Sequence, residues 1–233
     1  MRLRNIPGAR EAVAADSRCF DTPEETKGRW QEIFGNDHPL MVEVGMGKGR
    51  FIIENALRHP EINYIGIERY ESVIIRALQK LDRMNAEELK HPEMPSSDRA
   101  IKTGAPPNLR FLRMDAAEIR LFFEPRSIQR IYLNFSDPWP KDRHARRRLT
   151  SREFLMRFRE ILKDDGTIEF KTDNLDLFRF SLDEQAIAGW KLLYSTEDLH
   201  SDQEAMKNNI MTEYEQKFSA RGNKICKYSI SKR

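Results

Sequence analysis

The chain has 233 residues, of which 39% are apolar and 33% are charged, and its formal net charge is +3. This length suits one sizeable domain and is short for two. No stretch reaches the roughly 18 to 20 consecutive apolar residues of a membrane span, and no apolar segment of signal-peptide length follows the basic N-terminus, so we expect a cytoplasmic location. Cys19 and Cys226 lie near opposite ends of the chain, and neither a disulfide nor a zinc site is expected.

The N-terminal region divides into an arm and a helix. Residues 1–21 lack hydrophobic periodicity and are expected to form a flexible arm, ahead of one folded domain over residues 22–233. Thr22 opens a Thr-Pro-x-Glu sequence, which has the spacing of a capping box. This pattern predicts a helix that ends near Phe34.

Beyond this helix, short apolar runs alternate with segments of helical spacing. Such alternation predicts a parallel sheet with helices on both faces, joined by right-handed crossovers. Ligands of such sheets bind outside the carboxyl ends of the strands, where the strand order reverses. The predicted strands cover residues 40–44, 64–67, 109–114, 128–135, 166–171, 191–196 and 224–230, and the predicted helices cover residues 51–57, 70–84, 116 onward and 154–162.

One segment interrupts the alternation of strands and helices. Residues 90–108, approximately, contain four prolines and few apolar side chains. We expect an inserted surface loop there and assign it no chemistry.

The first strand of the alternation runs into a glycine-rich turn directly before a helix. Its sequence from Glu43 is E-V-G-M-G-K-G, and Gly45, Gly47 and Gly49 allow the backbone to approach a ligand at the helix N-terminus. A dinucleotide fingerprint would have Gly or Ala where this chain has Arg50, and a phosphate-binding P-loop would have Ser or Thr at Gly49. Neither of these motifs fits well.

Acidic residues close the first three of these strands. Glu68 ends the second strand, where a carboxylate can accept hydrogen bonds from both ribose hydroxyls of an adenosine. Asp115 ends the third, where an adenine amino group would lie, although Asp115 and Glu118 also have capping-box spacing and both interpretations stay open. With Glu43, these acids favour a nucleoside cofactor that carries positive charge over a pyrophosphate.

The fourth strand leads into a segment suited to a nucleic acid. Asp137 lies at the carboxyl edge of the sheet, and Trp139 and the basic run Lys141–Arg148 follow it. An acid, an aromatic ring and cations are what an unstacked base and its phosphates need. The alternative is a rigid loop with a buried Trp139 and a solvated basic face, which is the usual explanation for a charge run.

The segment N-F-S-D-P-W-P-K-D-R-H-A-R-R-R-L, residues 134–149, resembles the signature of the bacterial tRNA (guanine-N7)-methyltransferase family, which acts on the variable loop. The glycine turn, Ile67-Glu68, the sequence F-K-T-D-N at residues 170–174 and T-E-Y-E at residues 212–215 occur in that family's order. The resemblance covers residues 42–230, approximately. The insertion at residues 90–108 is longer than the family's usual connection.

The resemblance implies an α/β fold of the Rossmann-like class I type, with a seven-stranded, mostly parallel sheet and helices on both faces. It implies transfer of a methyl group from S-adenosyl-L-methionine to N7 of a guanine in tRNA, at position 46 of the variable loop. The implied cofactor residues are Glu43, Gly45, Gly47, Gly49, Glu68, Asp115 and Asp137. The implied substrate residues are Lys141, Arg143, His144, Arg146, Arg147, Arg148, Asp173, Thr212, Glu213, Tyr214 and Glu215.

Two of the implied substrate segments have structural alternatives. Thr212 and Glu215 have the spacing of a capping box, and Asp173 with Asn174 can cap the helix that follows. Neither segment would be assigned to a substrate without the resemblance.

Guanine N7 carries an in-plane lone pair and no proton, so methylation at this atom requires no general base. Asp137 is therefore expected to be catalytic through positioning and through negative charge that offsets the cationic product. Two other functions remain as alternatives, namely an RNA-binding protein that retains the fold and a methyltransferase that acts on another substrate. tRNA is the expected partner, no membrane or metal is expected, and the sequence leaves monomer and homodimer open.

Overall fold

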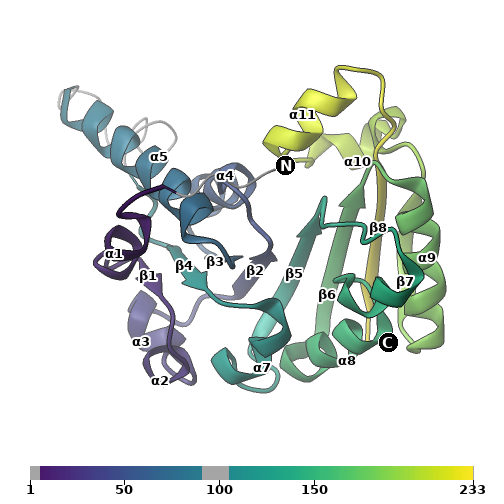
Figure 1. Cartoon of the computed structure of the whole chain (residues 1–233), viewed down its shortest axis with the longest axis horizontal. Helices are drawn as coiled ribbons and strands as arrows, with labels where there is room; N and C mark the ends of the chain where they lie inside the picture. The colour runs from purple at the N-terminus through teal and green to yellow at the C-terminus, as the bar shows by residue number, and fades with distance from the viewer. Residues whose placement is uncertain (1–5, 91–104, 233) are drawn as a thin grey trace.

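The computed structural model describes residues 6–90 and 105–232. Within these residues a single sheet of eight strands has the order β1-β4-β3-β2-β5-β6-β8-β7 (Figure 1). Neighbouring strands are parallel except around β8, which runs antiparallel to both β6 and β7. The strands are β1 (Cys19–Phe20), β2 (Leu40–Val44), β3 (Asn63–Glu68), β4 (Leu109–Arg113), β5 (Ile128–Asn134), β6 (Leu162–Thr172), β7 (Lys191–Thr196) and β8 (Cys226–Ser231).

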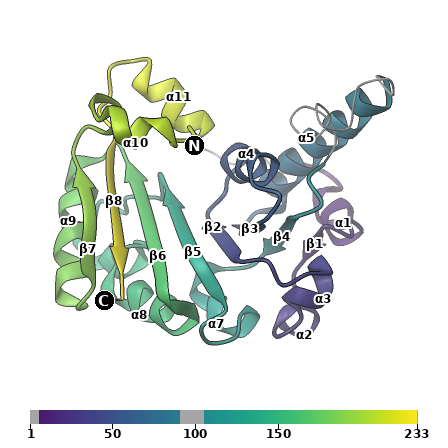
Figure 2. The same ribbon diagram turned by 180° about the vertical axis from the view of Figure 1, so that it is seen from behind.

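Helices cover both faces of the sheet, as the two opposite views show (Figures 1 and 2). One face is packed by α1 (Ala9–Ala14), α4 (Arg50–Arg58) and α5 (Glu71–Lys90), and the other by α3 (Trp30–Phe34), α7 (Ile119–Phe122), α8 (Arg152–Ile161) and α9 (Leu175–Ile187). The predicted α/β fold is therefore confirmed. The shorter helices are α2 (Pro23–Thr26), η1 (Ala116–Glu118), η2 (Asp142–Arg147), η3 (Leu199–Ser201), α10 (Gln203–Lys207) and α11 (Glu213–Ser219).

The position of β2 in the sheet shows where a ligand-binding site is expected. All five residues of β2 are buried, with Val42 and Val44 in one hydrophobic cluster and Met41 in the other, as expected for a central strand covered on both faces. The chain continues from β2 to β3 on one side, and it later returns to place β5 on the other side. The strand order therefore reverses between β2 and β5, which is where ligands of such sheets bind.

The N-terminal segment differs from the expected flexible arm. Helix α1 buries Val13 in the core and packs against α5, and β1 pairs in parallel with β4, which gives the eighth strand. Arg18 fixes the connection between them, because its guanidinium lies 2.6 Å from Asp16 and 2.8 Å from Asp82 of α5. A helix of six residues and a strand of two are too short to give a periodic signal. Residues 1–5 lie outside the described residues.

The predicted helix after Thr22 is divided in two. Helix α2 ends before Gly28, whose φ of +75° favours glycine, and α3 begins at Trp30. The predicted helix start is confirmed, because Thr22 is the N-cap residue and Pro23 is in the first turn, but the side chain of Thr22 makes no capping hydrogen bond.

The insertion predicted at residues 90–108 is wrong at both ends, where the chain belongs to a helix and to the core. Helix α5 continues to Lys90, and residues 91–104 lie outside the described part of the chain. At the other end, Asn108 is buried, and its Nδ2 donates to the carbonyls of Ala56, His59 and Ile62. Asn108 therefore belongs to the core and not to an inserted loop.

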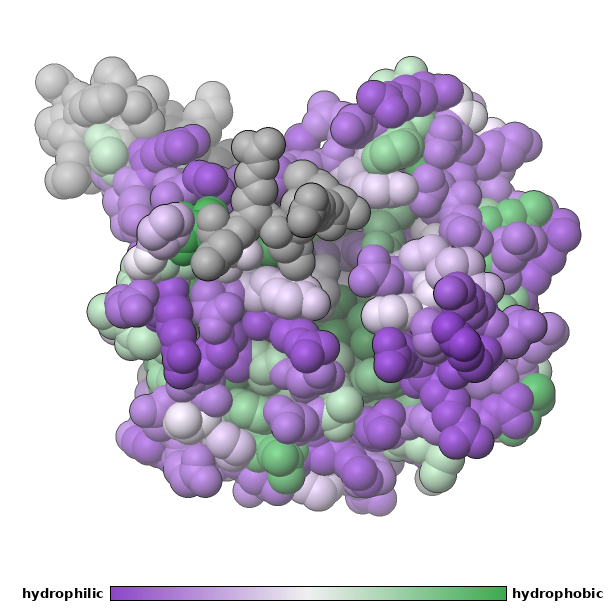
Figure 3. Space-filling model, in the orientation of Figure 1, coloured by the Kyte–Doolittle hydropathy of each residue, from purple (hydrophilic) through white to green (hydrophobic). Residues whose placement is uncertain are grey.

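The surface of the molecule is largely polar. In the view of Figure 3, hydrophilic residues dominate, and apolar residues appear in small patches and in a hollow near the centre. Among the described residues, no helix has the length and apolar character that a membrane crossing requires.

Candidate active site

The turn after β2 is built on three glycines with positive φ. The φ angles are 78° at Gly45, 56° at Gly47 and 76° at Gly49. A Cβ at Gly45 or Gly47 would have no atom within 4 Å, so the turn is open on that side, as a ligand-binding turn requires. A Cβ at Gly49 would lie 2.9 Å from the Cβ of Ala77 in α5, so this glycine also allows α4 and α5 to pack closely.

Glu68, at the end of β3, is bonded to the glycine turn. Its Oε2 accepts a hydrogen bond from the backbone N–H of Gly47 (3.2 Å), and its Oε1 accepts from the N–H groups of Arg69 (2.8 Å) and Tyr70 (3.3 Å). Burial raises the pKa of Glu68, the three N–H groups oppose that rise, and the charge of Asp137 adds to it. The carboxylates of β3 and of the loop after β5 therefore interact electrostatically across the strand edge.

Glu43 and Asn134 face each other across the switch point. Glu43 is only 1% exposed, and its Oε1 accepts a hydrogen bond from Asn134 Nδ2 (2.8 Å). Its Oε2 has no hydrogen-bond partner among the described residues, and burial raises the pKa of Glu43 to about 8. Asn134 was not among the predicted site residues, although it is the last residue of β5 and is followed at once by the Asp137 loop.

Asp115 fulfils the capping interpretation and stays partly accessible. Its Oδ1 accepts from the backbone N–H of Ala117 (3.0 Å) and so caps η1, while its Oδ2 lies 3.1 Å from the guanidinium of Arg69. The side chain is 41% exposed, so capping does not remove it from the strand edge.

The loop that carries Asp137 has an unusual backbone. Phe135 has a φ of 51° and Trp139 a φ of 42°, in a region that bulky residues rarely adopt. Arg148 holds this loop, since its guanidinium donates to the carbonyls of Pro138 (2.9 Å) and Trp139 (3.0 Å). The carboxylate of Asp137 is exposed between the two strained residues.

The basic run after this loop forms the short helix η2. The guanidinium of Arg147 lies over the ring of Trp139 at 5.0 Å, and the ring of His144 is perpendicular to that of Trp139, with 5.7 Å between the ring centroids. Trp139 is partly exposed, so the alternative of a buried tryptophan does not hold. Arg146 is 87% exposed, with one contact to Glu153 at 3.1 Å.

The predicted substrate residues therefore fall into two groups within the basic run. Lys141, Arg143, Arg146 and Arg147 are exposed and can meet phosphates, and His144 lies at their edge. Arg148 is different, because its guanidinium is taken up by backbone carbonyls and by the ring of Phe180 at 4.2 Å.

Helix α11 places the T-E-Y-E segment at the same edge of the sheet. The Tyr214 ring lies 4.9 Å from Phe135, and its hydroxyl lies 3.4 Å from Asp173, which also accepts from Asn223 Nδ2 (3.0 Å). Glu213 contacts Lys80 and lies 4.0 Å from the ammonium of Lys48 in the glycine turn. Asn174 caps α9 by accepting from Leu177 N–H (2.8 Å), and Asp173 is partly exposed.

Two members of the T-E-Y-E segment have structural partners. The hydroxyl of Thr212 accepts from the backbone N–H of Glu215 (2.9 Å), so Thr212 is the N-cap of α11. Glu215 is 0% exposed and lies 2.6 Å from the ammonium of Lys171. The predicted direct contact between Glu215 and a substrate is thus contradicted by its burial. Lys171, which was not a predicted site residue, forms an ion pair with that carboxylate.

The strand order, the glycine turn and the acids at consecutive strand ends define a class I methyltransferase fold. A family profile described as "Putative methyltransferase" matches residues 37–228. A solved structure described as an antibiotic-related methyltransferase superposes with a TM-score of 0.59 at 19% identity, covering 88% of this chain and 92% of that one. A 16S rRNA methyltransferase structure, KamB, gives a TM-score of 0.57 at 15% identity, with coverage of 88% and 92%. These two likenesses concern the fold.

The chain belongs to the tRNA (guanine-N(7)-)-methyltransferase family. It is 50% identical over 225 residues to the tRNA (guanine-N(7)-)-methyltransferase of Lachnoclostridium phytofermentans, covering 97% of this chain and 95% of the relative. It is 48% identical over 231 residues to the enzyme of the same name from a Geobacillus species, with coverage of 99% and 95%.

Proposed function

We propose that this protein is an S-adenosylmethionine-dependent enzyme that methylates N7 of a guanine in tRNA, at position 46 of the variable loop. The observation that carries the proposal is the juxtaposition of two surfaces at one edge of the sheet. Carboxylates lie at the ends of β2, β3 and β4, at the same edge as an open glycine turn, and the exposed Asp137 lies in the loop before the basic helix η2. The unpaired thiols of Cys19 and Cys226 fit action in a reducing cytoplasm.

The residues at the strand ends suit a cationic nucleoside cofactor. The turn around Gly45 and Gly47 leaves space for a ligand, and Glu68 is held by three backbone N–H groups in a position to accept ribose hydroxyls. Asp115 would lie beside the adenine amino group of the cofactor. Glu43 offers a buried carboxyl oxygen without a partner in the described residues, and a positively charged ligand nearby would favour its ionised form.

Methylation of guanine N7 requires no general acid or base from the protein. S-adenosylmethionine, when bound, supplies a sulfonium methyl group that a nitrogen lone pair can accept. The N7 lone pair would accept this methyl group directly, so no residue of the protein would have to remove a proton from N7. Asp137 would accept from guanine N1–H and the exocyclic amine, which aligns N7 and offsets the positive charge on the product base.

The exposed cations of η2 would bind the tRNA backbone. Lys141, Arg143, Arg146 and Arg147 present positive charge next to the Asp137 loop, and phosphate contacts of this kind supply most of the affinity for a nucleic acid. The partly exposed Trp139 would offer a ring face to a base. Tyr214 and Asp173 would contact the substrate from α11 and from the end of β6.

Incubation of the protein with labelled S-adenosylmethionine and unmodified tRNA, followed by nucleoside analysis, tests this function. We expect label in 7-methylguanosine, and its loss when the target guanine is replaced. Label in another nucleoside, or methylation of a free nucleoside in preference to tRNA, would favour a methyltransferase with a different substrate. Binding of tRNA without methylation would favour a non-catalytic RNA-binding protein.

A further inference from the structure

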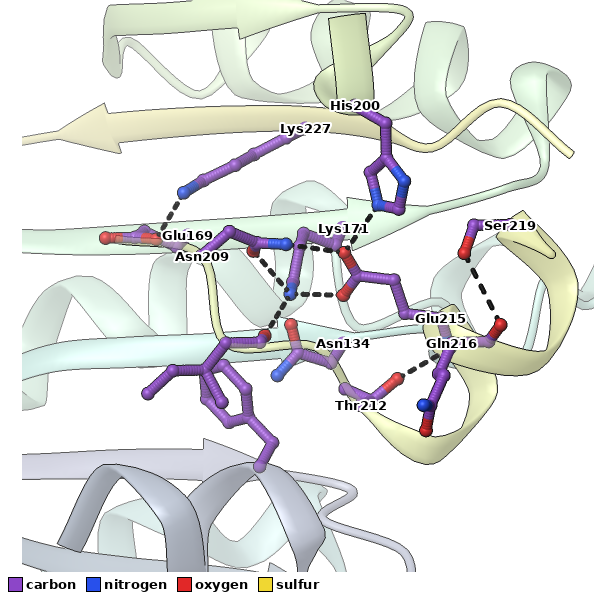
Figure 4. A network of polar contacts seen from close by, with 12 residues as sticks. Asn134, Glu169, Lys171, His200, Asn209, Thr212, Glu215, Gln216, Ser219 and Lys227 are labelled. Carbon is purple, nitrogen blue, oxygen red and sulfur yellow. Dashed lines mark hydrogen bonds and ion pairs between the residues drawn. The ribbon is translucent and has the colours of Figure 1, made fainter. Parts of the chain in front are cut away.

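A buried ion pair links the end of β6 to helix α11 (Figure 4). The ammonium of Lys171 donates to Glu215 Oε2 (2.6 Å), to the carbonyl of Ile210 (2.9 Å) and to Asn209 Oδ1 (3.1 Å). An ammonium has three N–H donors, so all of them are used. The side chain of Lys171 is 4% exposed, so this interaction takes place inside the protein.

The second oxygen of Glu215 is also occupied. Its Oε1 accepts from Asn209 Nδ2 (2.7 Å) and lies 3.0 Å from His200 Nε2. Burial alone would raise the pKa of Glu215, but the charge of Lys171 and these hydrogen bonds hold it below its usual value. The carboxylate is therefore ionised and fully satisfied, and it cannot bind another ligand without breaking the network.

This network fixes a helix that otherwise has exposed contacts. On one side α11 meets Lys48 and Lys80 through Glu213, and on the other side Tyr214 meets Phe135 of the Asp137 loop. Exposed ion pairs such as those of Glu213 constrain a helix weakly, because solvent screens them. The buried contact of Glu215 lies one residue after Tyr214, so it determines where the Tyr214 ring is held.

We infer that Lys171 is a positioning residue that acts through Glu215 to hold α11 in the register that keeps Tyr214 against Phe135. The inference rests on the proposed function, because it divides the T-E-Y-E segment into residues that contact the substrate and a residue that anchors the helix. Glu213 and Tyr214 face the site, whereas Glu215 points inward and anchors the helix that carries them.

A purely structural role can be separated from positioning by replacing both charges. Replacement of a buried ion pair by apolar side chains of similar volume is often neutral for stability, whereas removal of one partner leaves a buried charge. The double variant Lys171→Met/Glu215→Leu should therefore fold but lose the directional bonds. A matched control is Arg120→Met/Glu160→Leu, which removes an ion pair of 2.9 Å between α7 and the last turn of α8, directly before β6 begins.

The test measures thermal unfolding, amide hydrogen exchange of residues 209–219, cofactor affinity by calorimetry and tRNA methylation kinetics in both double variants. For Lys171→Met/Glu215→Leu we expect a melting temperature near that of the wild type and exchange in α11 that is faster by about tenfold or more. We expect kcat/KM for tRNA to fall by about tenfold or more, with little change in cofactor affinity. The control should keep both wild-type exchange in α11 and wild-type kinetics.

Wild-type exchange and wild-type kinetics in the stable double variant would overturn the inference, because Lys171 would then contribute only to stability. If the double variant does not fold, Lys171→Met/Glu215→Gln replaces it, since this pair of changes leaves no buried charge and keeps the size of the Glu215 side chain. Unchanged exchange in α11 and unchanged kinetics in Lys171→Met/Glu215→Gln would overturn the inference equally. The proposed function fails separately, if the wild type forms no 7-methylguanosine, whereas the exchange measurement still reports on α11.

Discussion

Arg148 donates a hydrogen bond from Nε to the carbonyl oxygen of Pro138 at 2.9 Å, and a second one from its terminal nitrogen reaches the next carbonyl, that of Trp139, at 3.0 Å. The guanidinium is also stacked over Phe180 at 4.2 Å. These contacts tie the end of η2 to the loop of Asp137, in which Phe135 and Trp139 have positive φ. Arg148 thus supports the backbone that presents Asp137, whereas Lys141, Arg143, Arg146 and Arg147 are exposed.

Replacing Arg148 by Met should lower turnover and leave the salt dependence of tRNA binding unchanged. Displacement of a reacting group by about 1 Å can cost on the order of 100-fold in rate, so we expect a loss of about 10- to 100-fold in kcat. The matched change Arg146→Met removes an exposed cation. It should reduce the slope of log K against log salt by about 0.7 to 0.9 and should affect kcat little. Binding isotherms at several salt concentrations and single-turnover rates distinguish the two variants, and a reduced salt slope in Arg148→Met would contradict its supporting role.

Glu68→Gln should weaken binding of S-adenosylmethionine. The amide keeps an acceptor for the N–H groups of Arg69 and Tyr70, but it loses the negative charge that ribose hydroxyls would meet. Hydrogen bonds to a charged group contribute about 1.5 to 3 kcal/mol, so affinity should fall by about 10- to 150-fold. Calorimetry measures the change, with the exposed Glu61→Gln as the control. Equal affinity in Glu68→Gln and the wild type would remove Glu68 from the cofactor site.

Glu43→Gln should change how the stability of the cofactor-free protein depends on pH. Burial raises the pKa of Glu43 from its ordinary value of 4.5 to about 8. Between these pH values the folded chain holds a proton that the unfolded chain has released, so this residue makes the free energy of unfolding fall as pH rises from 4.5 to 8. The variant lacks the ionisation, so its stability should decline less steeply over this range.

Denaturant unfolding at intervals between pH 5 and 8 provides the test of Glu43. The exposed Glu24→Gln serves as the control and should follow the wild type. Parallel stability curves for Glu43→Gln and the wild type would show that the folded protein ionises Glu43 as readily as the unfolded chain does.

Much of the fold could be predicted from the sequence because apolar runs bounded by turn residues mark strands well. The strands over residues 40–44 and 191–196 match β2 and β7 at both ends. The prediction failed for β1, because two residues carry no periodicity and only the pairing with β4 makes them a strand. It also failed at Gly28, where a left-handed residue divides a segment that otherwise has helical capping signals.

The site could be predicted in part, because acids at strand ends must meet at one edge of a parallel sheet. The predicted residues Glu43 and Glu68 do lie at that edge, with the glycine turn between them. The role of Glu215 could not be predicted, because its partner Lys171 is 44 positions away and a capping-box pattern says nothing about the direction of the acidic side chain. Arg148 posed the same problem, since a run of arginines does not show which one turns toward the backbone.

Asp137→Asn provides the most direct test of the claim that the protein methylates guanine N7 at the carboxyl edge of the sheet. The amide removes the negative charge and replaces one acceptor with a donor, which would face N1–H or the exocyclic amine of guanine. Loss of such an electrostatic contact costs on the order of 100- to 1000-fold in turnover. Affinity for tRNA should persist, because it comes mainly from phosphate contacts.

The decisive measurement is the single-turnover rate of 7-methylguanosine formation by Asp137→Asn on saturating tRNA, across a range of pH. The account predicts a folded variant that binds tRNA, forms 7-methylguanosine about 100- to 1000-fold more slowly than the wild type, and shows no recovery at high pH, since no proton leaves N7. A rate close to that of the wild type would contradict it.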